Sequence, residues 1–187
     1  VGAKYNEVCR DGLYPRFADS FLVCWTKGDE RAAERPVFVK YNRNRTAAYR
    51  LVTIIWEAAD GTRRVEKRAL SPEGNAHIAA FAERLALLRS EDRGLQYADA
   101  EITTADGLTS ARFPYVLGES FTSVICRELS QGQPLEDTLE RALQRIIGGG
   151  DVHNIDAIFD NFLVPEGAEA LGIDKVPLTG IDCEWVS

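Results

Sequence analysis

The stretch that decides the fold lies near the end of the chain, at residues 154–164, and has the sequence NIDAIFDNFLV. Asp156 and Asn161 stand five positions apart, and Asn161 leads directly into a short apolar run that predicts a β-strand. A second short strand is expected over 180–186, and it carries Asp182, 21 residues beyond Asn161. The sequence therefore predicts a polar loop followed by a hairpin, which together present two carboxylates and one amide.

These three side chains are of the types that phosphoryl transfer needs. One carboxylate orients or deprotonates the attacking hydroxyl, and an amide with a second carboxylate holds the divalent cations that neutralise nucleotide phosphates. Asp156 is the candidate for the first role, and Asn161 and Asp182 are the candidates for the second. A carboxylate on an apolar strand is costly without a cation or hydrogen-bond donors, which favours a functional role for Asp182.

The remainder of the chain predicts an α+β protein in the order strands, helix, two strands, helix, loop and hairpin, without βαβ alternation. Strands are expected over 21–26, 37–41, 49–57, 64–70, 97–104, 108–116 and 162–164. Two turns that contain Asp-Gly, at 59–62 and 105–107, predict hairpins. The strands before the first helix should therefore form an antiparallel meander of at least three members.

Two helices are expected, over 72–89 and 134–147. The first begins with Ser71 as N-cap and Pro72 at the first helical position. Its apolar residues follow at helical spacing and predict one buried stripe, made of Ile78, Phe81, Leu85 and Leu88. In the second helix the corresponding stripe is Leu135, Leu139, Leu143 and Ile146, and the glycines at 148–150 end the helix.

In this order, the motifs resemble those of the protein-kinase-like superfamily. The likeness is nearest to its small-molecule branches, such as aminoglycoside phosphotransferases and the kinase-like domains attached to bacterial cell-surface polysaccharide enzymes. The family's catalytic loop has Asp, four residues and Asn, matched by Asp156 and Asn161, and its metal-binding Asp ends a short strand, as Asp182 does. Its first lobe carries a lysine on the third strand, followed by a helix, and Lys67 matches it. The resemblance spans about residues 14–185.

This resemblance implies a protein-kinase-like fold of two lobes. Residues 1–117 would form an N-lobe, an antiparallel sheet with the one helix at 72–89. Residues 118–187 would form the hinge and a reduced C-lobe with the catalytic loop and the metal-binding hairpin. The chain is expected to be a fragment or part of a larger multidomain protein, and the thiols of its four cysteines are expected to be reduced in a cytoplasmic protein.

The resemblance also implies ATP between the lobes, with Lys67 on its α- and β-phosphates. Mg²⁺ would be held by Asn161 and Asp182, and Asp156 would accept the proton of an acceptor hydroxyl on a sugar or glycan. Lys67 would pair with a helix glutamate, and two candidates remain open. Distance along the chain favours Glu83, whereas the helical period places Glu83 about 180° from the apolar stripe; Glu73 lies only about 100° from that stripe, and we select Glu73.

Two departures from the family pattern keep other functions open. The turn at residues 42–48 contains no glycine, so Arg43 or Arg45 would have to contact phosphate, unless this is only an exposed basic turn. The chain also ends shortly after Asp182. One alternative is a catalytically inactive kinase-like module that binds nucleotide or a partner within a larger glycan-assembly protein. Another is a 3′–5′ exonuclease, whose first acidic motif resembles residues 180–185, but its two further Asp-bearing motifs would have to follow.

Composition excludes several other classes of protein. With 22 basic and 29 acidic residues the net charge is −7, which argues against a nucleic-acid partner because such a protein needs a basic face. The chain has two histidines and no CxxC pair, so a structural zinc site is not expected. Its apolar runs are far shorter than the ~20 residues of a transmembrane helix.

Overall fold

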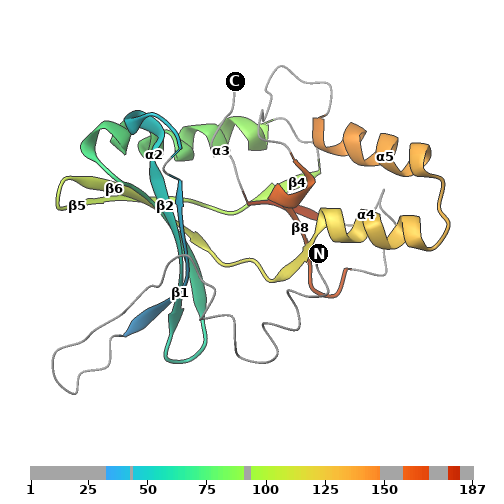
Figure 1. Cartoon of the computed structure of the whole chain (residues 1–187), viewed down its shortest axis with the longest axis horizontal. Coiled ribbons are helices and arrows are strands. Elements are labelled where there is room, and N and C mark those ends of the chain that lie inside the picture. The colour runs from blue at the N-terminus through green and yellow to red at the C-terminus, as the bar shows by residue number, and fades with distance from the viewer. Residues whose placement is uncertain (1–32, 43, 91–93, 148–157, 169–176, 182–187) are drawn as a thin grey trace.

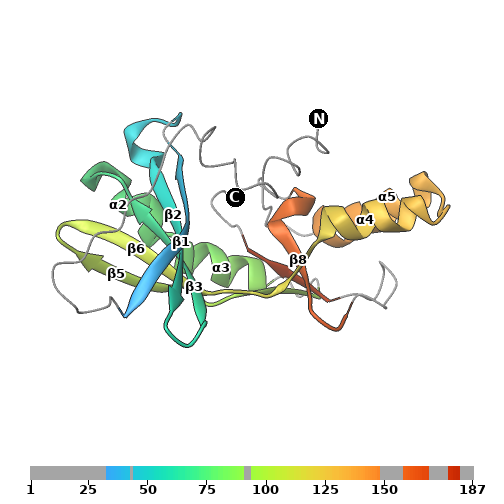
Figure 2. The same cartoon turned by 60° about the horizontal axis from the view of Figure 1, so that its bottom comes forward.

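The computed structural model describes residues 33–42, 44–90, 94–147, 158–168 and 177–181. This part of the chain is a mixed α+β structure with two β-sheets and several helices, so the predicted fold class is confirmed at that level. Figure 1 shows the larger sheet with α2 and α3 at one end of the molecule and α4 and α5 at the other, and Figure 2 shows the same separation from a second side. Two separate clusters of buried apolar residues stabilise these two ends.

The larger sheet is antiparallel and has the strand order β1-β2-β3-β6-β5. Its strands are β1 (Glu34–Asn42), β2 (Leu51–Ala58), β3 (Arg63–Ala69), β5 (Glu101–Ala105) and β6 (Leu108–Pro114). The predicted meander and both predicted hairpins are confirmed. At the second hairpin Asp106 and Gly107 have φ of 52° and 76°, the left-handed pair that a tight two-residue hairpin turn requires.

One face of this sheet, here called the inner face, packs against helices α2 (Asn75–Ala79) and α3 (Phe81–Ser90). Residues that pair directly across strands share a face, so Leu51 on β2 and Ala69 on β3 both point to these helices. All four residues of the predicted stripe are buried there, with exposed fractions of 5% or less. The apolar period of the sequence therefore identified the buried side of this helical segment correctly.

The helical segment is not the single helix over 72–89 that the sequence predicts. It begins with a 3₁₀ turn, η3 (Pro72–Gly74), and it is divided again at Ala80, between α2 and α3. Ser71 takes the N-cap position with an extended backbone, but its side chain makes no capping hydrogen bond. Pro72 and Gly74 both favour a tight turn over a regular α-helical start, which explains the broken beginning.

The smaller sheet has the order β4-β9-β8-β7 and mixes parallel and antiparallel pairing. Its strands are β4 (Leu95–Tyr97), β7 (Gly118–Ser120), β8 (Phe162–Pro165) and β9 (Leu178–Gly180). The predicted antiparallel hairpin near the C-terminal end is confirmed by the pairing of Phe162 with Gly180, but its second strand begins earlier than predicted, at Leu178, and ends at Gly180 rather than continuing through Ile181. Strand β4 lies within residues 1–117, the expected N-lobe, but it forms an edge strand of the smaller sheet.

Helices α4 (Phe121–Ser130) and α5 (Leu135–Ile147) pack beside the smaller sheet. Helix α4 was not expected from the sequence. It is capped by Ser120, whose hydroxyl accepts a hydrogen bond from the Ser123 amide at 3.2 Å. Helix α5 confirms the helix predicted over 134–147. None of the helices in the described part of the chain is long and apolar enough to cross a membrane.

The buried side of α5 confirms only part of the predicted stripe. Ile146 is buried and Leu139 is partly buried against the core, whereas Leu135 and Leu143 are 53% and 44% exposed. Thr138 and Ala142 are the other buried residues of the helix. The small side chains at 138 and 142 allow the helix to approach its neighbours closely. For this reason the helix buries these two residues, and Leu135 and Leu143 point outward. The predictions for residues 21–26, for the glycines at 148–150 and for the strand beyond Ile181 lie outside the described residues.

Candidate functional site

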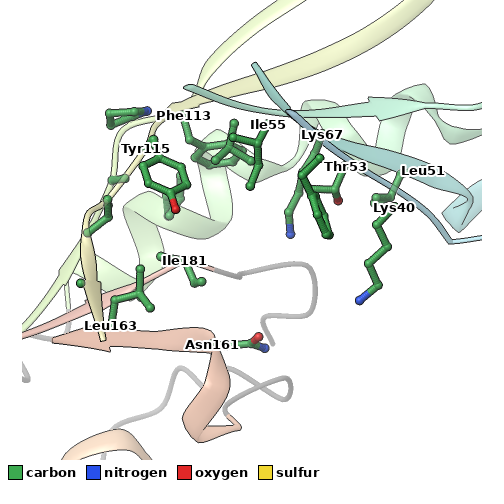
Figure 3. Close-up of a pocket in the computed structure, with 18 of the residues that line it drawn as sticks. Lys40, Leu51, Thr53, Ile55, Lys67, Phe113, Tyr115, Asn161, Leu163 and Ile181 are labelled. Atoms are coloured by element: carbon green, nitrogen blue, oxygen red, sulfur yellow. The ribbon is translucent and has the colours of Figure 1, made fainter. Parts of the chain in front are cut away.

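A cavity of about 560 Å³ lies between the inner face of the larger sheet and the β8–β9 hairpin of the smaller one. Its third side is the connection from β6 to β7. Figure 3 shows side chains from these elements converging on one space. The cavity is lined by Phe38, Lys40, Asn42, Arg45, Leu51, Thr53, Ile55, Val65, Lys67, Leu85, Ala98, Phe113, Pro114, Tyr115, Val116, Gly118, Ile158, Asn161, Leu163, Gly180 and Ile181. This volume lies in the usual range for small-molecule and cofactor sites.

Lys67 lies on β3, where it pairs with Thr53 on one side and Ala111 on the other. It is only 6% exposed, and its ammonium lies 5.5 Å from the centre of the Phe81 ring. The negative face of an aromatic ring offsets part of the cost of burying a charge. Figure 3 shows the amino group directed toward the hairpin on the opposite wall. The structure therefore presents the predicted phosphate-binding lysine to the cavity.

Asn161 approaches the same cavity from the other wall. Asn161 ends a short 3₁₀ turn, η4 (Phe159–Asn161), and its backbone N–H donates to the Ile158 carbonyl at 2.9 Å. The Ile181 amide in turn donates to the Asn161 carbonyl at 2.9 Å, which fixes the end of β9 beside the start of β8. The Asn161 side chain points toward the lysines of the sheet in Figure 3. Two predicted site residues thus line one cavity, one from a strand of the larger sheet and one from the turn before β8.

Glu73, the selected partner of Lys67, is not brought to this cavity. It is exposed on η3, where the neighbouring Ser71 hydroxyl lowers the pKa of its carboxyl. Glu83 is exposed as well, on the first turn of α3. What the helical segment presents to the cavity side of the sheet is Phe81 beside Lys67 and Leu85 in the lining.

The other two predicted site residues, Asp156 and Asp182, lie outside the described residues. In the sequence they are close neighbours of cavity residues, since Asp156 precedes Ile158 by two positions and Asp182 directly follows Ile181. Within the described ranges no group of three His, Cys, Asp or Glu side chains is arranged to hold a metal ion. Of the predicted metal ligands, the described structure therefore shows Asn161 alone.

The cavity has a polar end and an apolar end. The side chains of Ile55, Val65, Phe113 and Leu163 provide apolar walls, and the Tyr115 ring lies near them in Figure 3. The polar end holds Lys67, Asn161 and Thr53. Among the described lining residues there are three cations, Lys40, Arg45 and Lys67, and no Asp or Glu. In a chain of net charge −7 this concentration of positive charge favours an anionic ligand.

Lys40, Thr53 and Tyr115 are site residues that the sequence reasoning missed. Lys40 could have been found from strand alternation, because it shares one strand face with Phe38 and Asn42. Tyr115 follows the last residue of β6, in the connection between the two sheets, and no local motif marks it. Residues of this kind can be assigned to the cavity only when the register of the neighbouring strands is known.

The outer face of β3 carries a buried carboxylate directly beside Lys67 in the chain. Glu66 is 5% exposed and accepts hydrogen bonds from Trp56 Nε1 at 2.8 Å, Ser110 Oγ at 2.9 Å and Arg64 Nη1 at 3.2 Å. Burial alone would raise the pKa of Glu66, but these donors outweigh it and lower the pKa. The network joins β2, β3 and β6 and so stabilises the strand that carries Lys67.

Neither a scan against models of known protein families nor a search of curated proteins finds a match to this chain.

Proposed function

We propose that this protein is an ATP- and Mg²⁺-dependent phosphotransferase of protein-kinase-like fold, acting on a hydroxyl of a small molecule or glycan. The observation that carries the proposal is the convergence on one cavity of Lys67, from the larger sheet, and Asn161, from the turn that leads into β8 of the smaller sheet. The lysine on the third strand of an antiparallel sheet, with a helical segment after it, also agrees with the resemblance in the sequence. By that resemblance, cell-surface polysaccharide assembly is the proposed setting.

The two ends of the cavity suit the two ends of a nucleotide. A flat base fits between Ile55 and Val65 on one side and Leu163 on the other, near the backbone of the connection after Phe113. The triphosphate then extends to the polar end, where Lys67 binds its oxygens through charge-assisted hydrogen bonds. The cavity volume of about 560 Å³ is sufficient for a ligand of this size.

The chemical roles follow from the residue types. Asn161 and Asp182 would hold Mg²⁺, which would supply neutralisation of the phosphate charge. The acceptor oxygen forms a bond to the terminal phosphorus while the bond from that phosphorus to the bridging oxygen breaks. Asp156 takes the proton of the acceptor hydroxyl, and ADP leaves. The protein contributes positioning and charge stabilisation rather than a covalent intermediate.

Calorimetric titration of the full chain with ATP tests this proposal. We expect ATP to bind in the presence of Mg²⁺ and to bind more weakly when the metal is chelated. Lys67→Met and Asn161→Ala should each lower ATP affinity about tenfold or more, as loss of a charged or metal-binding contact predicts. Arg68→Met is the matched control, because it removes a cation from the next position of β3 on the opposite face. Absence of ATP binding, or equal affinity in all four proteins, contradicts the proposal.

A second candidate is a module that binds nucleotide without transferring phosphate. It is favoured by the glycine-free connection between β1 and β2, which replaces a flexible phosphate loop with a 3₁₀ turn, η2 (Ala47–Tyr49). Asp156→Ala and Asp182→Asn separate the two candidates. An enzyme loses transfer of labelled terminal phosphate in Asp156→Ala while ATP still binds, and it loses metal-dependent binding in Asp182→Asn. A binding module shows no transfer in the unmodified protein either.

A further inference from the structure

Only two lysines occur among the described residues, Lys40 and Lys67, and both line the same cavity. Lys40 on β1 pairs with Thr53 on β2, and Thr53 pairs with Lys67 on β3. Residues that pair directly across antiparallel strands share a face, so the two lysines flank one threonine on the inner face of the sheet. Figure 3 shows both amino groups directed toward the wall that carries Asn161.

The register sets the distance between the two lysines. Two strand spacings separate their backbones by roughly 10 Å. Because the backbones stand this far apart, an elongated anion with several charged groups suits the pair better than a single phosphate does.

The connection between β1 and β2 offers little backbone for binding phosphate. Residues 43–50 contain no glycine. The amides of Tyr49 and Arg50 already donate to the carbonyls of Thr46 and Ala47, at 2.9 and 3.3 Å. The Arg50 side chain also donates to the Arg45 carbonyl at 2.7 Å, which fixes the turn further. Two amides of this connection are therefore already used within the turn, which favours side chains such as Lys40 as phosphate ligands on this side of the cavity.

From this arrangement we propose that Lys40 and Lys67 form a two-lysine clamp for a polyphosphate chain. Lys67 binds the phosphates near the nucleoside, and Lys40 binds the terminal phosphate, with the Thr53 hydroxyl between them. The clamp makes the site selective for triphosphates over monophosphates. The inference rests on the proposed nucleotide site, but it assigns a role to Lys40 that the catalytic motifs do not contain.

The test is calorimetric titration with AMP, ADP, ATP and inorganic tripolyphosphate, each in the presence of Mg²⁺. Lys40→Met should lower the affinity for ATP and tripolyphosphate about tenfold, as loss of one charge-assisted contact predicts, and leave AMP affinity unchanged within about twofold. Lys40→Arg keeps the charge and should retain most of the ATP affinity. Arg68→Met, on the opposite face, should change none of these affinities. Circular dichroism of each variant checks that the fold is retained.

The outcomes separate this inference from the proposed function. If the unmodified protein binds ATP and Lys40→Met weakens ATP and AMP equally, or weakens neither, the clamp is overturned while the nucleotide site stands. If tripolyphosphate binds in a Lys40-dependent way but no adenine nucleotide binds more tightly than tripolyphosphate, the clamp stands and the nucleotide function is overturned. If neither ATP nor tripolyphosphate binds, both are overturned.

Discussion

Two neighbouring residues of β3 perform opposite tasks on the two faces of the sheet. Lys67 presents a cation to the cavity, and Glu66 anchors the outer face through three hydrogen-bond donors. The sequence identified Lys67 because a motif surrounds it, but it gave no sign of the Glu66 network. The partners Trp56 and Ser110 lie 10 and 44 positions away, and only the strand register brings them to Glu66.

Glu66→Gln should reduce stability at neutral pH by about 1 kcal/mol, because the neutral amide loses the charge-assisted bond to Arg64. The pKa of Glu66 is lowered in the folded state. Its contribution is therefore complete above the unfolded-state pKa, near 4.5, and is lost as the pH falls through the lower folded-state value. Urea unfolding of both proteins between pH 3 and about 7 should show the difference shrinking toward acid pH. A constant difference across this range contradicts the assignment.

At the scale of single residues, sequence reasoning was weakest for partners across space. The selection of Glu73 assumed an α-helical period from residue 72 onward, but Glu73 lies in the 3₁₀ turn η3, which precedes the α-helix. The α-helical period holds for the stripe from Ile78 to Leu88 and does not extend back to Glu73. Lys67 and Asn161 did not depend on such a period, and both line the cavity.

At the scale of elements, the hydrophobic pattern of the sequence predicted the hairpins and two helical segments. It did not predict helix α4 or the full buried face of α5, which depend on packing. The sequence of α4 has polar and apolar residues at a helical period, but this segment, between the strand β7 and helix α5, is not among the predicted helices. Helix α5 was recognised, yet its buried face is the one with small residues. Hydrophobicity alone favours the leucines, whereas close approach of two helices favours alanine and threonine.

Substitutions on adjacent residues of α5 test the corrected face. Ala142 is fully buried, so Ala142→Leu should destabilise the protein by about 1–3 kcal/mol through overpacking. Leu143→Ala removes a side chain that is 44% exposed, and should cost less than about 1 kcal/mol. Urea unfolding measures both changes. The reverse ranking would show that the leucine face is the buried one.

The edge of the smaller sheet that borders the cavity depends on a close backbone approach of β7 to β8 at Gly118. A Cβ atom at this position would overlap the carbonyl of Val164 on the neighbouring strand β8. Gly118→Ala should therefore force β7 away from β8, cost about 2 kcal/mol or more in stability, and weaken ATP binding, because Gly118 lines the cavity.

Gly132→Ala is the control for Gly118→Ala. Gly132 has φ of +82° with open space around it, so alanine there should cost only about 1 kcal/mol and leave ATP binding unchanged. Thermal unfolding and calorimetry measure the two effects. Equal losses of ATP affinity in both variants would show that Gly118 acts through general stability and not through the close approach of β7 to β8.

At the scale of the whole molecule, the cavity is a product of topology. Its walls come from segments that are more than 100 residues apart in the chain, from Phe38 on β1 to Ile181 after β9. Local sequence patterns predicted the elements of each sheet, but not that β4 would join the second sheet or that the β6–β7 connection would close one side. The proposed activity depends on this convergence, since neither sheet alone contains both Lys67 and Asn161.

Photoaffinity labelling with 8-azido-ATP and Mg²⁺, followed by peptide mapping, tests most directly whether both sheets contact one nucleotide. The account predicts label on the peptide that contains Tyr115 and on at least one peptide from β2–β3 or β8, with labelling of both suppressed by excess ATP. Label confined to other regions, or labelling that excess ATP does not suppress, would contradict a nucleotide site between the sheets.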